Sequence, residues 1–293
     1  GLGISMVAPM TYTLVGELFP LEKRVSAIGW INAGDGLAFI IGAPIIGIIA
    51  GIGGWRVTFI GFVLPITLLS FVMAVKWIPS PMQSSHPPRN KGKYMEGIRG
   101  VFANYSAIAC LGGAALSWAG WQAILVYSAS FFRQHFHIST GYASIIIGSA
   151  VFSYAVGTLV SGQAVTRLGK RPITVITGVI AGVFIILYTN VPISWIAFAL
   201  MALGCLFFGT LVTTAYSLTL EQLPYFRGTM MSLNSAAARI GTSLGAGVGG
   251  MVLLVSGYEY VGLILGAMIL AAALIYYLLV SDPMRSEDSV NEI

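Results

Sequence analysis

The sequence is a succession of apolar runs, each close to the length of about 20 residues that a helix needs to cross about 30 Å of hydrocarbon. The runs are continuous and lack the alternation of apolar and polar residues that marks barrel strands. Lipid offers the backbone no hydrogen bonds, so a spanning segment has to be a helix or part of a closed barrel. The runs therefore predict an all-α membrane protein.

Composition supports this class. Hydrophobic residues make up 57% of the chain and charged residues only 9%, whereas soluble domains carry roughly a quarter charged residues. Such a chain cannot cover itself with polar surface, so we expect the lipid bilayer to be its main partner. Nine spans are predicted, at 1–19, 26–51, 57–77, 103–132, 142–165, 173–187, 194–220, 229–255 and 260–280.

One long polar stretch, at 79–99, interrupts the spans. It combines several prolines and serines with the basic residues Arg89, Lys91, Lys93 and Arg99, which is typical of a solvated linker. Three spans precede it and six follow. The predicted organisation is a partial N-terminal bundle (1–78), a linker (79–102), a six-helix bundle (103–281) and a tail (282–293).

Basic residues occur mainly in alternate gaps between the spans. The rich gaps hold Lys23 and Arg24, the linker cations, and Arg167, Lys170 and Arg171, whereas the other gaps hold little beyond Arg56 and Arg133. The positive-inside rule then predicts a cytoplasmic linker and C-terminus. We expect a multi-pass protein of the plasma (inner) membrane. The net charge of +5 is explained by this orientation, so no nucleic-acid partner is expected.

The chain contains an internal repeat. Residues 11–20 align with 215–224 at an offset of 204, and after one deletion Arg24 aligns with Arg227 at an offset of 203. Parallel halves are a known transporter architecture; the alternative is coincidence between membrane helices rich in small residues. If the first three spans repeat the last three, the spans in 103–187 lack a counterpart, and three further helices are expected upstream of Gly1.

Two motifs indicate a family. The segment 162–171, with Gly162, Arg167, Gly169, Lys170 and Arg171, is similar to the loop signature Gly-x-x-x-Asp-Arg-x-Gly-Arg-Arg of the major facilitator superfamily, with Thr166 in place of the aspartate. The second span resembles the glycine and proline signature of the fifth helix in proton antiporters of that superfamily. Its predicted helix-bend residues are Gly42, Pro44 and Gly47.

The resemblance implies the major facilitator fold, with this chain forming helices four to twelve of a twelve-helix transporter. It implies alternating access around a cavity lined by the spans 1–19, 103–132 and 194–220, and proton-coupled efflux of a small organic solute by a monomer. One alternative is a facilitator or symporter that imports sugars or organic acids. Another is a transport-inactive membrane fragment or scaffold. No cofactor and no enzymatic activity are expected.

Two charged residues lie deep within predicted spans. Asp35 is about ten residues into its span and hence near the middle of the bilayer, where a carboxylate costs about 2.5 to 3.5 kcal/mol on insertion scales. It is a candidate proton or substrate site, or else a structural hydrogen-bond acceptor. Arg239 keeps its charge, so it is a candidate anchor for an anion, or else part of a structural ion pair.

Aromatic and polar residues on three spans are candidates for a solute pocket. The repeat places Tyr12 and Tyr216 symmetrically, and Trp121 and Gln122 lie on the span 103–132. Small-molecule sites combine aromatic walls with a few polar groups, although Trp and Tyr near span ends also serve as interface anchors.

The remaining candidates are weaker. Glu17 and Glu221 occupy matching repeat positions close to the predicted cytoplasmic surface, where they either pair with basic residues or latch a gate. His135 and His137 have no third ligand nearby, so no metal site is predicted. We find no phosphate-cradling glycine loop and no clustered serine, histidine and acid that would indicate an enzyme.

Overall fold

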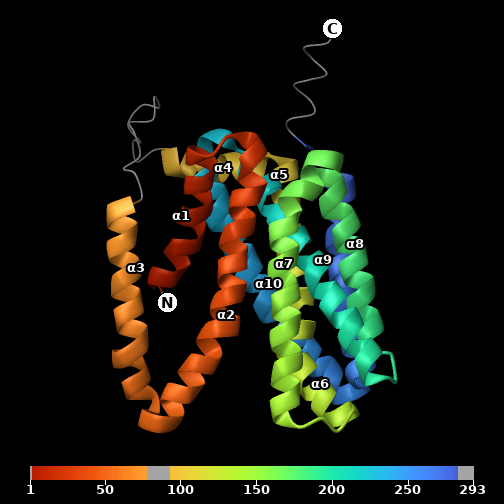
Figure 1. The fold of residues 1–293 in the computed structure, drawn as a ribbon. Coiled ribbons are helices and arrows are strands. Elements are labelled where there is room, and N and C mark those ends of the chain that lie inside the picture. The colour runs from red at the N-terminus through yellow and green to blue at the C-terminus, as the bar shows by residue number, and fades with distance from the viewer. Residues whose placement is uncertain (1, 78–92, 283–293) are drawn as a thin grey trace. The chain divides into compact units, whose positions relative to one another are not determined.

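The computed structural model describes residues 2–77 and 93–282 and is helical almost throughout that part of the chain (Figure 1). It divides into two compact units: Gly1–Gly36 with Tyr94–Ile293, and Leu37–Lys93. We refer to them as the large and the small unit. The helices are α1 (Leu2–Leu18), α2 (Leu21–Thr58), η1 (Phe59–Val63), α3 (Leu64–Trp77), α4 (Lys93–Ala103), α5 (Tyr105–Gln122), η2 (Ala123–Tyr127), α6 (Ser128–His135), α7 (Thr140–Leu168), α8 (Lys170–Tyr188), α9 (Ser194–Glu221), η3 (Pro224–Phe226), α10 (Arg227–Ser256) and α11 (Tyr258–Leu279).

The helices confirm the all-α fold class. Within the described residues, eight helical segments are long and apolar enough to cross a membrane. The predicted first span corresponds to α1, which has 17 residues. The gap expected between the spans 26–51 and 57–77 contains a kink at Gly54, where the backbone leaves the helical conformation with a φ of 74°. Glycine adopts this left-handed conformation at little cost.

The large unit is a bundle in which helices distant in sequence lie side by side (Figure 1). Helix α9 packs against α7 and α8, helix α11 packs against α5 and α8, and α10 packs against α5 and α1. Small residues allow the closest approaches. A Cβ atom added to Gly241 of α10 would lie 1.9 Å from the carbonyl oxygen of Ala115 in α5, so these two backbones are in direct contact.

Apolar side chains occupy both the interior and the exterior of the large unit. Phe131, Phe208 and Tyr276 are fully buried, whereas Leu254 and Val255 near the end of α10 are 88% and 86% exposed. Many other large hydrophobic residues are exposed as well. A soluble protein rarely exposes so much apolar surface, so the exterior is suited to contact with lipid.

Helix α4 forms part of the region predicted as a linker. The rest of that stretch, at 78–92, lies outside the described residues. Helix α4 packs on the turn between α9 and α10, where Gly97 lies against Phe226 and Thr229. Its opposite face is exposed and includes Met95 and Phe102. We call the end of the large unit that carries this helix the α4 end.

The small unit contains the second part of α2, the π-helical turn η1 and helix α3. The proposed bend residues Gly42, Pro44 and Gly47 fall within continuous helix. The surroundings of Pro44 and Gly47 lie outside the described part of the structure, so the role of these residues in a bend stays a prediction.

Candidate functional site

A cavity of about 460 Å³ lies within the large unit. Residues from six helices line it, including the first part of α2. The lining residues are Ala8, Pro9, Tyr12, Asn32, Asp35, Trp118, Tyr154, Tyr216, Ser232, Ser235, Ala236, Ala238, Arg239 and Thr242. A volume of this size accommodates a small organic molecule.

The structure brings four of the predicted site residues to this cavity: Tyr12, Asp35, Tyr216 and Arg239. The rings of Tyr12 and Tyr216 are in contact, with centroids 4.7 Å apart and planes inclined by 59°. The two tyrosines of the repeat therefore meet on one wall of the cavity.

Trp121 and Gln122 are buried and do not line the cavity. The indole of Trp121 stacks on Phe208 with ring centroids 4.4 Å apart, and it also contacts Tyr154. Because Tyr154 itself lines the cavity, Trp121 contacts a residue of the cavity wall without lining the cavity. Trp118, one turn earlier on α5, is the tryptophan that reaches the cavity.

Asn32 is a site residue that the sequence analysis missed. Tyr12 Oη donates a hydrogen bond of 2.7 Å to Asn32 Oδ1, and Asn32 Nδ2 donates one of 3.1 Å to Thr213 Oγ1. These bonds join α1, α2 and α9. A buried amide one helical turn before Asp35, in an otherwise apolar span, was the available signal. Tyr154 was also missed, and nothing in its local sequence distinguishes it from other aromatic residues in spans.

Asp35 and Arg239 place opposite charges on the cavity wall from α2 and α10. Their charges lie close enough to interact. Among the described residues, however, neither side chain forms a hydrogen bond or an ion pair within 4.0 Å. Both charged groups therefore face the cavity without a directly bound partner.

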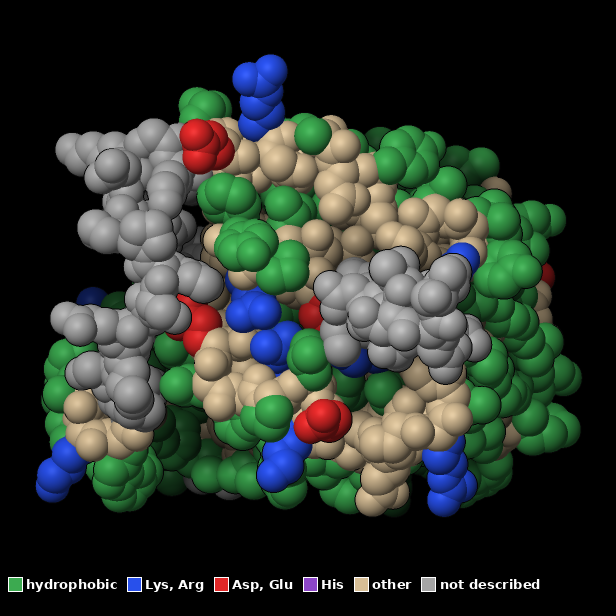
Figure 2. Space-filling view, turned by 90° about the horizontal axis from the view of Figure 1, so that it is seen from above, with side chains coloured by type: hydrophobic (Ala, Val, Ile, Leu, Met, Phe, Trp, Pro, Cys, Tyr) green, Lys and Arg blue, Asp and Glu red, His purple; other side chains and the backbone are tan. Residues whose placement is uncertain are grey.

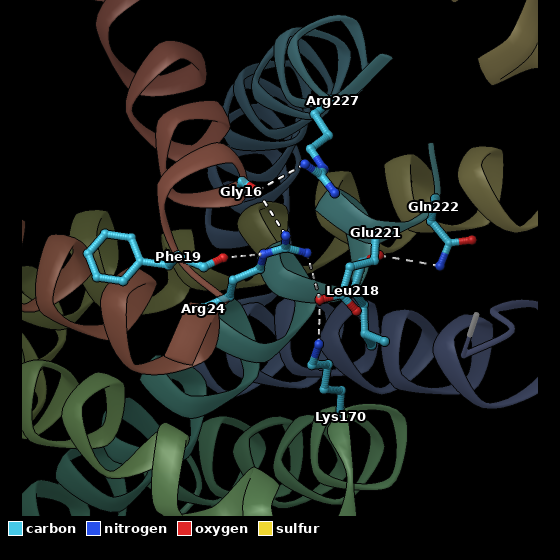
Figure 3. A network of polar contacts seen from close by, with 8 residues as sticks. All are labelled: Gly16, Phe19, Arg24, Lys170, Leu218, Glu221, Gln222 and Arg227. Atoms are coloured by element: carbon cyan, nitrogen blue, oxygen red, sulfur yellow. Dashed lines mark hydrogen bonds and ion pairs between the residues drawn. The ribbon is translucent and has the colours of Figure 1, made fainter. Parts of the chain in front are cut away.

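A second cluster of charged groups lies at the α4 end (Figures 2 and 3). Glu221, the last residue of α9, is 3% exposed. Its Oε1 contacts Lys170 Nζ and lies 3.9 Å from a guanidinium nitrogen of Arg24. The expectation that Glu221 pairs with basic residues is confirmed. Glu17, its repeat counterpart, is exposed and makes no such pair within the described residues.

The two arginines matched by the repeat converge on one backbone carbonyl. Arg24 Nη2 donates a hydrogen bond of 2.8 Å to the oxygen of Gly16, and Arg227 Nη1 donates one of 2.9 Å to the same oxygen (Figure 3). Arg24 Nε also donates to the oxygen of Phe19. We call Arg24, Lys170, Glu221 and Arg227 the end cluster; it connects the turn between α1 and α2 to α8, α9 and α10.

The predicted loop motif lies between α7 and α8 at the same end. Gly162 packs directly against Ser26 of α2, and Gly169 has a φ of 85° at the turn. Lys170 belongs to the end cluster, whereas Arg171 donates to the carbonyl oxygens of Tyr276 and Tyr277 near the end of α11. The last motif cation, Arg167, is exposed.

His135 and His137 lie at the end of the large unit opposite to α4. His135 stacks on Phe131, with ring centroids 5.3 Å apart, and His137 is exposed. Within the described residues, no group of three histidine, cysteine, aspartate or glutamate side chains is placed to hold a metal ion.

Long apolar helices and an apolar exterior define a multi-pass integral membrane protein, and this one has an internal cavity with charged groups. The family model described as Major Facilitator Superfamily matches residues 1–224 and 110–292. The chain belongs to this superfamily.

Individual relatives are distant. An uncharacterized MFS-type transporter of Bacillus subtilis, YwfA, is 24% identical, and the match covers 92% of this chain and 65% of that protein. The chain thus spans somewhat less than two thirds of this curated relative.

Solved structures share the fold. The proton:xylose symporter XylE is similar with a TM-score of 0.74 and 16% identity, over 95% of this chain and 68% of XylE. The human organic anion transporter MFSD10 is similar with a TM-score of 0.72 and 13% identity, over 92% of this chain and 67% of MFSD10.

Proposed function

We propose that this chain belongs to a secondary transporter that works by alternating access and exports a small organic solute in exchange for protons. The observation that carries the proposal is the position of Asp35. Its carboxylate faces the cavity without a bound partner among the described residues. A carboxylate in this position can take up and release a proton where the solute binds, which coupling the two requires.

The end cluster supports alternating access. Arg24 lies in the first copy of the repeat, and its partner Glu221 lies in the second. Lys170 of α8 contacts the same carboxylate. Because the cluster joins the two halves at the α4 end, opening the cavity toward that end would break its bonds. Closing the cavity there would restore them. Such bonds across two halves are suited to a gate.

The distribution of charge supports an orientation in which the α4 end faces the cytoplasm. Figure 2 looks onto this end and shows Lys and Arg side chains with acidic groups between them. The basic residues of the α1–α2 turn, of the α7–α8 turn and of the start of α10 all lie here. We propose the plasma membrane as the location and a monomer as the working form.

Flux measurements in proteoliposomes test this function. The protein is reconstituted, and candidate solutes are screened by counterflow and by uptake driven by an imposed pH gradient. Exchange of protons for solute predicts that an opposed pH gradient drives solute accumulation and that the solute in turn moves protons, which a trapped pH-sensitive dye reports. Counterflow of solute that is unaffected by the pH gradient would favour a facilitator. Accumulation of solute in the same direction as the proton flow would favour a symporter. Flux equal to that of empty liposomes for every solute would favour an inactive fragment or scaffold.

A further inference from the structure

Three of the six hydroxyl groups on the cavity wall, those of Tyr12, Ser232 and Thr242, donate their hydrogens within the protein. Tyr12 donates to Asn32, as described above. Ser232 and Thr242 donate to the carbonyl oxygens four residues earlier in α10, at 2.8 and 2.9 Å. These two hydroxyls can therefore only accept a hydrogen bond from a solute. The hydroxyl groups of Tyr154, Tyr216 and Ser235 complete the neutral part of the wall, which carries no charge to match an ionised group of a solute.

The charged groups supply what the neutral wall lacks. The guanidinium of Arg239 has five N–H donors, and the carboxylate of Asp35 has two acceptor oxygens. Neither side chain forms a hydrogen bond or an ion pair within 4.0 Å among the described residues. The cationic donors thus lie at Arg239, on α10, and the anionic acceptors lie at Asp35, on α2.

We propose that the cavity selects a zwitterionic solute, with an ammonium group at Asp35 and a carboxylate or similar oxyanion at Arg239. The proposal rests on the proposed function only in taking this cavity as the solute site. The planar fork of a guanidinium matches an oxyanion with two hydrogen bonds. An ammonium group has three donors and no acceptor, which suits the carboxylate of Asp35.

Desolvation explains why both charges are needed on the solute. When the cavity closes, Asp35 and Arg239 lose water, and a buried charge without a partner is strongly disfavoured. A solute with a single charge compensates one residue and leaves the other alone. The aromatic rings of Trp118, Tyr154 and Tyr216 on the same wall are suited to an apolar body between the two charged groups.

The competing arrangement is direct pairing of Asp35 with Arg239 around an uncharged solute. Binding measurements on the purified protein in detergent distinguish this arrangement from the proposed zwitterion site. The probes share one indole ring: tryptophan and glycyl-tryptophan are zwitterions of different charge separation, tryptamine carries only the amine, indole-3-propionate carries only the acid, and 3-methylindole is uncharged. We expect at least one zwitterion to bind tenfold or more tightly than each of the other three probes. Equal or tighter binding of any of those three, or no binding by either zwitterion, would overturn the proposal.

Two substitutions assign the charges. Asp35→Asn should abolish the preference for the zwitterion over indole-3-propionate and keep the preference over tryptamine. Arg239→Gln should abolish the preference for the zwitterion over tryptamine and keep the preference over indole-3-propionate. Glu259→Gln and Arg133→Gln remove exposed charges at the end opposite to α4 and should change neither preference. A monodisperse chromatography profile and an unchanged melting temperature exclude misfolding, and preferences that survive both cavity substitutions would refute the assignment.

Failure of this proposal is distinguishable from failure of the proposed function. If a zwitterion binds but no solute flux is measured in proteoliposomes, the proposed transport function is wrong and the proposed binding site is retained. If the protein carries out proton-coupled flux but shows no preference for zwitterionic solutes, the proposed function is retained and the zwitterion site is wrong.

Discussion

The rings of Tyr12 and Tyr216 meet at a centroid distance of 4.7 Å, although 204 positions separate the two residues in the chain. Each occupies the same place in its copy of the internal repeat. Their contact shows that the two copies face one another across the large unit at this point. The pair is not equivalent in its hydrogen bonds, because the hydroxyl group of Tyr12 alone is bonded to Asn32.

Loss of the Glu221 carboxylate should destabilise the protein. Glu221→Gln leaves the side chains of Arg24 and Lys170, 8% and 12% exposed, without their counter-charge, and breaking a buried pair in this way costs about 3 to 5 kcal/mol. We expect a clearly lower melting temperature in detergent. Glu17→Gln, at the matching and exposed repeat position, is the control and should leave the melting temperature unchanged. Equal effects of the two substitutions would show that the end cluster adds no stability.

The contact between α5 and α10 should tolerate no added methyl group. Gly241→Ala would place Cβ 1.9 Å from the oxygen of Ala115, and overpacking of this kind costs about 1 to 3 kcal/mol. In the same helix, Gly247 has no atom within 4 Å of an added Cβ. Gly247→Ala should therefore be neutral or stabilise the helix by up to about 1 kcal/mol. Unfolding in increasing denaturant measures both; a stable Gly241→Ala variant would contradict the close backbone contact.

Asp35→Asn should separate proton coupling from solute movement. Asparagine keeps the shape of the side chain but cannot take up or release a proton. In proteoliposomes, accumulation of solute driven by a pH gradient should be lost, while solute exchange at saturating concentration should persist in part. Ser243→Ala, in the exposed part of α10, is a suitable control. Unchanged gradient-driven accumulation in the Asp35 variant would assign this carboxylate a structural role.

Orientation can be tested by labelling single introduced cysteines. The natural cysteines, Cys110 and Cys205, are both buried, so they should react little with a polar maleimide. Met95→Cys on α4 and Ser139→Cys before α7 are exposed and lie at opposite ends of the large unit. In intact cells, an impermeant reagent should label the cysteine at position 139 only, and the cysteine at position 95 should react after the cells are opened. The reverse pattern would invert the topology.

Hydropathy predicted most of the fold because crossing a bilayer is a local requirement of length and polarity. The span expected at 194–220 is helix α9, Ser194–Glu221. The repeat added information about distant contacts, and it correctly singled out Tyr12 and Tyr216 as a pair. Asp35 and Arg239 were identifiable because a charge within a span is rare, and the structure places both at the cavity.

What the sequence did not reveal depends on packing between helices. Trp118 and Trp121 lie on the same helix, and only their neighbours decide that Trp118 lines the cavity while Trp121 stacks on Phe208. The role of Asn32 follows from partners on α1 and α9. Likewise, the sequence did not show that the gap between the spans 26–51 and 57–77 is as short as a kink at Gly54, where a single glycine absorbs the change of direction.

The π-helical turn η2, at Ala123–Tyr127, interrupts the span Tyr105–His135 near its middle. Such a turn weakens the regular ladder of backbone hydrogen bonds, and here a neighbouring helix compensates: Tyr188 Oη of α8 donates a hydrogen bond of 2.8 Å to the carbonyl oxygen of Ala123. At its other end, Tyr127 Oη donates to the carbonyl oxygen of Ala246 in α10. The π-helical turn η2 is therefore hydrogen-bonded to both α8 and α10. Taken out of the bundle as a peptide, the same stretch loses both external partners, and we expect it to relax to an ordinary α-helix, with every residue after Ala123 rotated relative to those before it.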